Sequence, residues 1–257
     1  MSLFTLIMPT KNRSKHIKNS IQSITAQTET NWELIIIDDH GTDDTEVIIE
    51  SFNNPKIKYY KLTDLATGPG AARDYGIKKA TGDYIVIADS DDINKPNRLE
   101  ILRNAISENP AVDVFYGDLE IIRDDETIIS KSCPFNAELL KRYNFIFNPA
   151  SCFKKETYLK SAGYDLDLFT SEDYDLWLSL LEVQAKFIYI PEIMTEKIDH
   201  SESITINTDF DFRKNNLLKV REKHNLPIPN SSEVEKILPD YIWQRINQKR
   251  GLEFWFN

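Results

Sequence analysis

Three carboxylates stand within four positions of the chain, at Asp89, Asp91 and Asp92, directly after the short apolar segment 84–88. Side chains two positions apart in an extended chain point to the same side, so Asp89 and Asp91 face one way together. Like charges this close repel each other, which indicates a bound cation, a shared proton or strong hydrogen bonding. Capping the next helix needs only one acid. We therefore predict a divalent-metal site that holds a phosphorylated ligand, with Mg²⁺ or Mn²⁺ favoured over Zn²⁺ by the oxygen ligands.

A second acidic pair, Asp38 and Asp39, ends another apolar segment, where a carboxylate can accept hydrogen bonds from a ribose or a base edge. The alternative is turn chemistry, because Asp is common in turns and helix caps. Arg73 lies one turn inside a predicted helix that begins with Gly-Pro-Gly at 68–70, where free backbone N–H groups attract an anion. Taken alone, Arg73 is better explained as a solvated helix residue.

Glu172 and Asp173 follow Thr170 and Ser171 at the start of a predicted helix. Acids at that place favour the helix dipole and complete a capping pattern, which is the structural explanation for them. The functional interpretation is that one of the two is a general base at a helix start beside a cleft. His200, in the segment DHSES at 199–203, is one of four histidines and by itself indicates only a surface position.

The hydrophobic pattern predicts the elements that position these residues. Strand-like and helix-like segments alternate through the first 110 residues, which is typical of βαβ units and a mostly parallel, doubly wound sheet. Ligands bind at the carboxyl ends of such strands, where the acidic pairs lie. The predicted strands cover 3–8, 32–37, 57–62 and 84–88, and the predicted helices begin near Ser14, Thr42, Gly68 and Pro96.

After Pro110 the pattern changes to a mixed α+β half. Segments 112–122 and 127–130 flank a polar turn and predict an antiparallel hairpin. The tail from about residue 208 is helical in character, with an interruption at 226–229. The other predicted elements are helices near 136–143, 155–161 and 172–181, a strand at 186–190 and a strand-like segment at 194–198.

Composition limits the classes of protein. The net charge of −10 and the pI near 5.0 argue against a nucleic-acid binder, although a metal ion can still supply positive charge for a phosphate ligand. Cys133 and Cys152 form no disulfide framework, so we expect a reducing cytoplasm. We see no secretory leader and no bilayer-spanning run. Aromatic and basic residues near the C-terminus fit either a peripheral membrane contact or ordinary packing.

The order of these motifs resembles a known family. The chain is similar to the inverting, metal-dependent nucleotide-sugar glycosyltransferases of glycosyltransferase family 2, which have the GT-A fold. The resemblance extends to about residue 205 and implies a nucleotide-sugar-binding half at 1–110, an acceptor-binding and catalytic-base half of the same domain at 111–205, and a helical tail at 206–257. The matching segments are IMPTKNR (7–13), IIIDDHGTDDT (35–45), GPGAARDYGIKKATGDYIVIADSDD (68–92), TSEDYDLWL (170–178) and, more loosely, DHSES (199–203).

The resemblance implies nucleotide-binding roles in the first half. Pro9, Thr10 and Asn12 lie on the loop that binds the nucleotide in the family. Asp39 would meet the base, usually uracil, and Arg73 would contact the nucleotide or its phosphates. His40-Gly41 departs from the family's usual Gly-Ser, and Asp74 replaces a more common Asn.

The resemblance also implies the metal ligands and the base. Asp89 and Asp91 match the D-x-D motif, in which Asp91 is the better candidate for a direct Mn²⁺ or Mg²⁺ ligand and Asp89 lies with both nucleotide and metal. Glu172 and Asp173 match the family's E-D pair, and we prefer Asp173 as the base. His200 occupies a region where some members contribute a residue near the diphosphate, so we place it with the metal.

The expected activity is transfer of a sugar from a nucleoside-diphosphate sugar, preferably a UDP-sugar, to a hydroxyl of a saccharide or lipid-linked saccharide in bacterial surface-polysaccharide synthesis. We expect no nucleic-acid partner and a cytoplasmic location, with peripheral contact at the inner membrane face left open; the oligomeric state stays unknown. One alternative is a sugar-phosphate nucleotidyltransferase, but residues 9–13 lack the glycine-rich loop that it needs. A receiver domain is usually far shorter. A non-catalytic nucleotide-sugar-binding or polysaccharide-binding relative is the third alternative.

Overall fold

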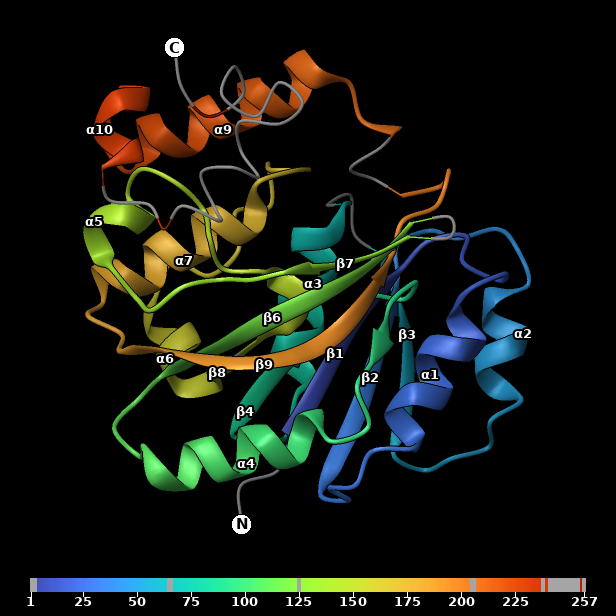
Figure 1. The fold of residues 1–257 in the computed structure, drawn as a ribbon. Helices are drawn as coiled ribbons and strands as arrows, with labels where there is room; N and C mark the ends of the chain where they lie inside the picture. The colour runs from blue at the N-terminus through green and yellow to red at the C-terminus, as the bar shows by residue number, and fades with distance from the viewer. Residues whose placement is uncertain are drawn as a thin grey trace.

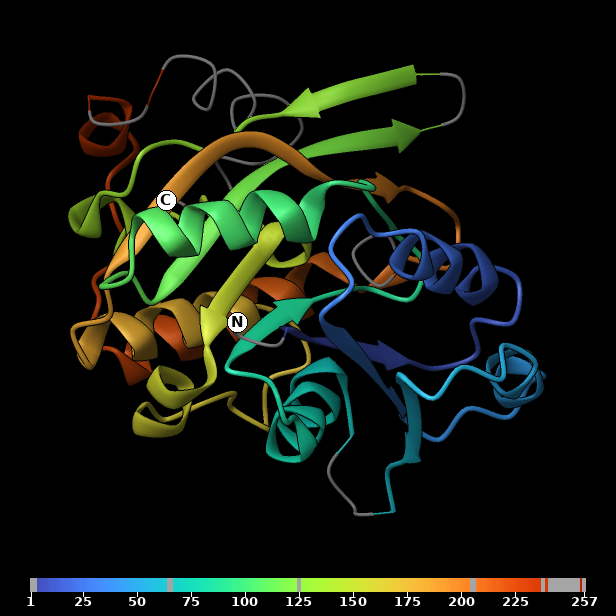
Figure 2. The ribbon, with the colours of Figure 1, turned by 90° about the horizontal axis from the view of Figure 1, so that it is seen from below.

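The computed structural model describes residues 4–63, 67–123, 126–203, 207–236, 239 and 255. Its strands form one curled sheet in the order β3-β2-β1-β4-β8-β6-β9-β5, with β7 paired to β6 outside this path (Figure 1). Helices lie on both faces of the sheet, as the view from below shows (Figure 2). The predicted α/β class is confirmed.

The first half supplies the parallel part of the sheet. Aliphatic residues dominate β1 and β2, and nearly all of both strands is buried, as expected for strands covered on both faces. The carboxyl ends of all four strands therefore meet at one edge. The strands are β1 (Phe4–Thr10), β2 (Trp32–Asp38), β3 (Ile57–Lys61) and β4 (Tyr84–Ile87), and the helices are α1 (Ile17–Thr25), α2 (Thr45–Glu50), α3 (Pro69–Lys79) and α4 (Arg98–Glu108).

The second half supplies a mixed part. The predicted hairpin is present as β6 (Val114–Arg123) and β7 (Glu126–Ser130). The two segments predicted near 186–190 and 194–198 form one long strand, β9 (Phe187–Ile198), which runs parallel to β6. The remaining elements are β5 (Ile93–Asn94), β8 (Ser151–Lys154), the 3₁₀ turn η1 (Asn148–Ala150), and the helices α5 (Ala137–Leu140), α6 (Lys155–Lys160), α7 (Glu172–Glu182), α9 (Phe210–Lys223) and α10 (Ser231–Glu235).

Strand β8 was absent from the prediction and joins the two halves. It pairs antiparallel with β4 on one side and with β6 on the other. Its four residues, SCFK, are too few for an alternating pattern, and three of them are buried. Only the long-range pairing identifies this segment as a strand.

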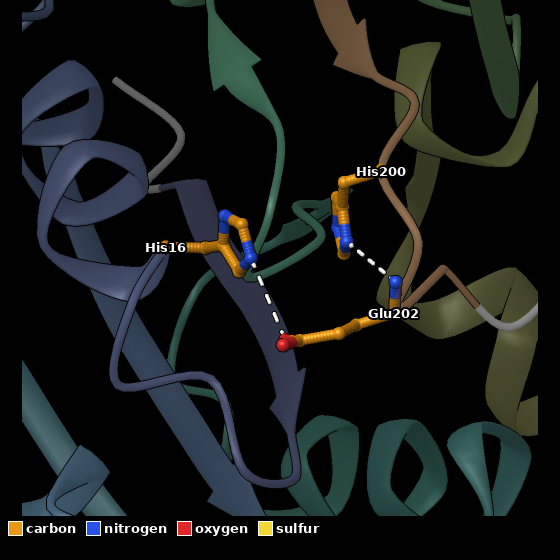
Figure 3. A group of neighbouring side chains, drawn as sticks. All are labelled: His16, His200 and Glu202. Carbon is orange, nitrogen blue, oxygen red and sulfur yellow. Dashed lines mark hydrogen bonds and ion pairs between the residues drawn. The ribbon is translucent and has the colours of Figure 1, made fainter.

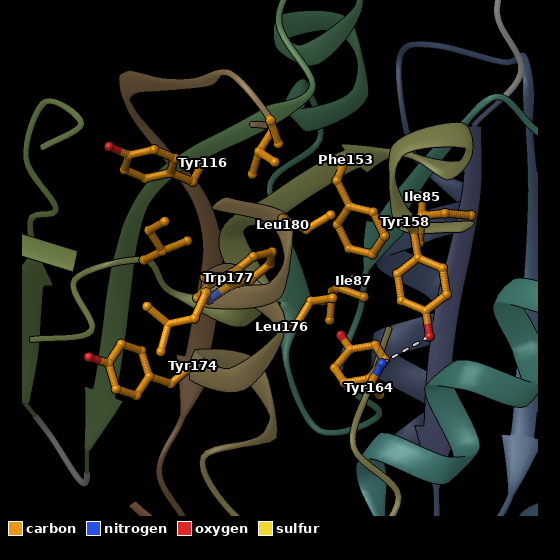
Figure 4. Packing of buried hydrophobic residues seen from close by; sticks show 14 of the residues in the cluster. Ile85, Ile87, Tyr116, Phe153, Tyr158, Tyr164, Tyr174, Leu176, Trp177 and Leu180 are labelled. Carbon is orange, nitrogen blue, oxygen red and sulfur yellow. Dashed lines mark hydrogen bonds between the residues drawn. The ribbon is translucent and has the colours of Figure 1, made fainter. Parts of the chain in front are cut away.

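Two hydrophobic clusters fill the layers on the two faces of the sheet. One contains Ile17 and Ile21 of α1 with Leu99 of α4. The other lies on the α3 and α7 side, where Trp177 packs against Phe153 with ring centroids 6.1 Å apart (Figure 4). None of the helices in the described ranges combines the length and the apolar character that crossing a bilayer requires.

Two predicted helix starts are wrong in detail. Ser14 does not cap α1, which begins at Ile17; the Ser14 N–H instead donates to the Asp43 carboxylate at 2.9 Å. Helix α4 begins at Arg98, two residues after Pro96. Neither helix has a side-chain hydrogen bond at its N-cap, which is His16 in α1 and Asn97 in α4.

Helix α9 is joined to α7 by a buried charge cluster. Asp175 of α7 is fully buried and accepts from Lys223 Nζ and from His224 Nε2, both at 2.9 Å. The other ring nitrogen of His224 lies 2.7 Å from Glu182 Oε1. Burial alone would lower the pKa of His224, but the hydrogen bonds to Asp175 and Glu182 outweigh it and raise this pKa above its ordinary value of 6.5.

We expect His224→Gln to lower the free energy of unfolding most at acidic pH. Because the folded pKa of His224 is raised, its stabilisation is complete below pH ~6.5 and is lost as pH rises through the folded pKa. Urea unfolding of both proteins from pH 5.5 to 9 measures the difference. Glu182→Gln removes only the more exposed partner and should cost less at every pH. A gap between wild type and His224→Gln that widens with pH would contradict this assignment.

Candidate active site

A cleft of about 770 Å³ opens at the carboxyl ends of the parallel strands, and its volume lies in the range of small-molecule sites. The loops after β1, β2 and β4 line one side, and the N-termini of α3 and α7 line another. The predicted residues that line the cleft are Pro9, Thr10, Asn12, Asp39, Arg73, Asp89, Asp91, Glu172 and Asp173. His200 lies behind Asp91 and contacts it.

The loops after β1 and β2 hold each other in place. Asn12 adopts a left-handed backbone conformation with φ 53°, and its Oδ1 accepts the Thr42 N–H at 2.7 Å. The Asp39 N–H donates to the Thr10 carbonyl at 2.8 Å. The Thr10 hydroxyl is buried in the cleft wall and has no hydrogen-bond partner within the described ranges.

The two acids that end β2 have different tasks. Asp38 builds the turn, because its carboxylate accepts from the Gly41 N–H at 2.7 Å and from the Tyr59 hydroxyl at 2.8 Å. A Cβ at Gly41 would lie 2.6 Å from Asp38 Oδ1, so a larger residue would displace this carboxylate. Asp39 faces the cleft and accepts the Gly68 N–H at the start of α3, at 2.9 Å. Turn chemistry therefore explains Asp38 and not Asp39.

Arg73 is buried and joins the two halves of the site. Its Nη2 lies 2.9 Å from Asp89 Oδ1, and its Nη1 lies 2.6 Å from Glu172 Oε1. Only 4% of the residue is exposed, so the interpretation of Arg73 as a solvated helix residue is wrong. One guanidinium thus neutralises an acid of the metal motif and an acid of the predicted base pair.

We expect Arg73→Met to destabilise the fold by about 3–5 kcal/mol, because it leaves two partly buried carboxylates without their cation. Urea unfolding at pH 7 measures the loss. Lys78→Met on the same helix removes an ion pair whose lysine is 63% exposed, and should cost less than about 1 kcal/mol. Equal losses of unfolding free energy in the two variants would show that the Arg73 ion pairs stabilise the fold no more than an exposed ion pair does.

Asp91 stands between two cationic or potentially cationic groups. Arg13 Nε lies 3.3 Å from its Oδ2, and His200 Nε2 lies 3.1 Å from the same oxygen. The neighbouring Asp92 points away into the core, where its Oδ1 accepts the Ile198 N–H of β9 at 3.2 Å. Burial raises the pKa of Asp92 well above its ordinary value, and Lys197 opposes the rise. Asp92 therefore fastens the acidic loop to β9.

A second group of metal-type ligands lies beside Asp91 (Figure 3). The rings of His16 and His200 stack with centroids 4.2 Å apart, and the Glu202 N–H donates to His200 Nδ1 at 3.1 Å. His16 Nε2 lies 3.7 Å from Glu202 Oε2. His16 was not predicted, because nothing in the polar run after β1 marks it. Glu202 lies in DHSES, and no role was predicted for it.

The donor set fits a divalent cation. Asp91 and Asp89 offer carboxylate oxygens at the cleft, and imidazoles stand directly behind Asp91. Carboxylate oxygens suit Mg²⁺ and Mn²⁺, and Mn²⁺ also accepts imidazole nitrogen. A cation bound to Asp91 would compete with Arg13 for Oδ2. Lys11, Arg13 and Lys197 add positive charge along the same wall and were missing from the prediction.

The acids at the start of α7 differ in what neutralises them. Burial raises the pKa of Glu172 to about 7, although the Arg73 guanidinium opposes the rise. Burial also raises the pKa of Asp173. Asp173 accepts from Asn144 Nδ2 at 3.2 Å and from the Tyr174 N–H at 2.8 Å. Among the described residues no cation forms an ion pair with Asp173 within 4 Å, so its carboxylate keeps its capacity to accept a proton.

The capping explanation for this helix start is only partly correct. Ser171 occupies the N-cap position with φ 63° but makes no side-chain capping hydrogen bond. The Thr170 hydroxyl instead accepts from Asn216 of α9 at 3.0 Å. The two acids are thus presented to the cleft by a helix start that other elements hold.

Comparison with known proteins gives a consistent result. The model of glycosyl transferase family 2 matches residues 5–157. The UDP-Glc:alpha-D-GlcNAc-diphosphoundecaprenol beta-1,3-glucosyltransferase WfgD of Escherichia coli is 32% identical over 183 residues, which cover 70% of either chain. Chondroitin synthase of Escherichia coli is 26% identical over 260 residues, covering 95% of this chain and 36% of that protein.

Solved structures share the fold. Residues 1–349 of S. aureus TarS, in complex with UDP-GlcNAc, superpose with a TM-score of 0.76 at 18% identity, covering 98% of this chain and 75% of that chain. The mannosyltransferase PcManGT of Pyrobaculum calidifontis, in complex with GDP-Man and Mn²⁺, gives 0.64 at 18% identity, covering 86% and 64%.

Proposed function

Since this chain belongs to glycosyl transferase family 2, and is thus a glycosyltransferase of the GT-A fold, we propose that it transfers a sugar from a UDP-sugar to a saccharide hydroxyl with inversion. The observation that carries the proposal is the Arg73 bridge. It brings the metal-motif acid Asp89 and the helix start with Asp173 to one cleft of ligand-binding size. A donor diphosphate and an acceptor hydroxyl need those two groups side by side.

We assign the nucleotide to the parallel edge. Pro9, Thr10 and Asn12 form the wall on which the nucleoside would lie, and Asp39 would accept a hydrogen bond from the base. Arg73 and Lys197 would supply positive charge to the diphosphate. The UDP-GlcNAc bound in the TarS complex, and the UDP-Glc in the name of WfgD, support a uridine nucleotide.

The proposed reaction is a single displacement. Asp173 removes the proton from the acceptor hydroxyl, whose oxygen attacks the anomeric carbon on the face opposite the leaving nucleoside diphosphate. Glu172 is occupied by Arg73, which makes it a positioning residue for that guanidinium. A base works only when deprotonated, so turnover should decline as pH falls. Because the pKa of Asp173 is raised, this decline should begin at a higher pH than it would with an ordinary Asp as the base.

We propose that Asp91 holds the divalent cation, with Asp89 and His200 beside it. When bound, the cation would neutralise charge that develops on the leaving diphosphate. The Mn²⁺ in the PcManGT complex supports Mn²⁺ or Mg²⁺ in this role. The acceptor is expected to be a saccharide or a lipid-linked saccharide, as the diphosphoundecaprenol in the name of WfgD supports.

A nucleotide-sugar panel tests the proposal. Thermal shift and donor hydrolysis are recorded for UDP-, GDP- and dTDP-sugars, each with Mn²⁺, with Mg²⁺ and with chelator. We expect a UDP-sugar to raise the melting temperature in the presence of metal, with hydrolysis that the chelator stops. No response to any donor would favour the non-catalytic binding relative. A parallel assay with sugar phosphate plus nucleoside triphosphate tests the other alternative, and product formation there would favour the nucleotidyltransferase.

A further inference from the structure

The outer end of the hairpin β6–β7 continues one wall of the cleft. Lys197 of β9 stands opposite Ile121 of β6, and Ile121 stands opposite Ile128 of β7. Residues directly opposite each other in a sheet project on the same face. Lys197 and Ile121 both line the cleft, so the side chain of Ile128 extends this wall toward the outer strand.

The opposite face of the hairpin has a different character. Glu120 and Glu196 both accept from Lys95 Nζ, at 2.6 Å and 2.5 Å. Ile129 stands opposite Glu120 and shares this charged face. Ile128 and Ile129 are 42% and 53% exposed. These two neighbouring isoleucines are thus similarly exposed, and they lie on opposite faces of the hairpin.

Other apolar residues also line the cleft. Strands in a sheet lie ~4.8 Å apart, which places Ile128 roughly 10 Å from Lys197 across β6. Leu119 lines the cleft two residues before Ile121, and Ile146 and Phe147 line it close to Asn144, which contacts Asp173. We call Ile121, Ile128 and Phe147, the three of these residues that are not buried, the apolar lane.

We propose that the apolar lane holds the hydrocarbon chain of a lipid-linked acceptor, whose sugar hydroxyl lies at Asp173. This inference rests on the proposed function and specifies its acceptor class. A free saccharide is polar and gains nothing from an apolar path between Asp173 and the sheet edge, whereas a hydrocarbon chain is driven onto such a surface by burial. Within the described residues β7 pairs only with β6, so the lane is open at its outer end.

The experiment compares two glucosides that differ only in the length of the hydrocarbon chain. Binding of dodecyl β-D-glucoside, below its critical micelle concentration, and of methyl β-D-glucoside is measured by calorimetry on the full chain. We expect the dodecyl ligand to bind at least about tenfold tighter, because each buried CH₂ adds favourable transfer free energy. Equal affinities would overturn the proposal.

The two isoleucines supply a matched pair of variants. Ile128→Asn should bring the affinity for the dodecyl ligand to within about twofold of the methyl ligand, since it places an amide on the lane. Ile129→Asn should keep the full preference, and so should Ile128→Leu. If Ile128→Asn does not fold, Ile128→Thr replaces it, because Thr is well accepted in strands.

Equal losses in Ile128→Asn and Ile129→Asn would overturn the lane and point to a bilayer contact that covers both faces of the hairpin. A different result would contradict the proposed function, namely no thermal shift and no hydrolysis with any nucleotide-sugar in the panel. If the dodecyl ligand binds more tightly than the methyl ligand but no nucleotide-sugar gives a response, the apolar lane remains a lipid-binding surface and the transfer reaction is rejected.

Discussion

Asp173→Asn is expected to abolish sugar transfer while leaving donor binding intact. The amide keeps the shape of the carboxylate and its place beside Asn144, but it cannot accept a proton. Proton transfer to a positioned base contributes typically ~10²–10⁴-fold in rate, and we expect a loss of that size in kcat. Transfer kinetics and the thermal shift produced by the donor with Mn²⁺ measure the two effects separately.

Glu172→Gln is the matched control for this variant. It weakens the contact with Arg73 and leaves the proposed base untouched, so kcat should fall less than in Asp173→Asn while the folded protein loses stability. Reversal of this order, with Asp173→Asn fully active, would assign the base to Glu172.

Asp91→Ala is expected to remove the dependence of donor binding on metal. Loss of its carboxylate would take away the proposed oxygen ligand. The cation would then no longer stabilise charge on the leaving diphosphate, so we expect turnover to fall by about 10²–10³-fold. Donor titrations with Mn²⁺ and with chelator should coincide in the variant and differ in the wild type.

His16→Ala separates the two groups of metal-type ligands. His16 contacts Glu202 and stacks on His200 (Figure 3). No hydrogen bond or ion pair in the described part of the chain joins His16 to Asp91. Metal-dependent donor binding should therefore weaken only modestly. A full loss in His16→Ala together with an unaffected Asp91→Ala would move the cation to the histidine group.

The parallel half could be predicted from the sequence because its signals are local. Short apolar segments such as 34–37 are typical of buried strands, and each is followed by polar residues that mark the carboxyl end. Since parallel strands gather these ends at one edge, Asp39, Asp89 and Asp91 could be placed together before any coordinates.

The rest depended on pairings that the sequence does not display. Arg73 looked like a surface residue because its partners, Asp89 and Glu172, are 16 and 99 positions away. His16 meets His200 and Glu202 only because β9 returns beside the β1 loop.

The predicted contacts of the aromatic and basic residues near the C-terminus fall, apart from Trp255, outside the described residues. Trp255 packs on Tyr143 with ring centroids 4.9 Å apart and lines the cleft. For this one residue, ordinary packing is the interpretation that the structure supports.

The position of β8 bears on how this protein can be recombined with others. The strand comes late in the chain yet fills the gap between β4 and β6, so a fragment that stops near residue 110 would expose the whole edge of β4 to other chains. The acidic loop after β4 would also lose the Ile198 N–H that fixes Asp92. Chimeras that exchange acceptor-binding halves between glycosyltransferases should therefore carry β8 and β9 with the incoming half and keep their pairing to β4 intact.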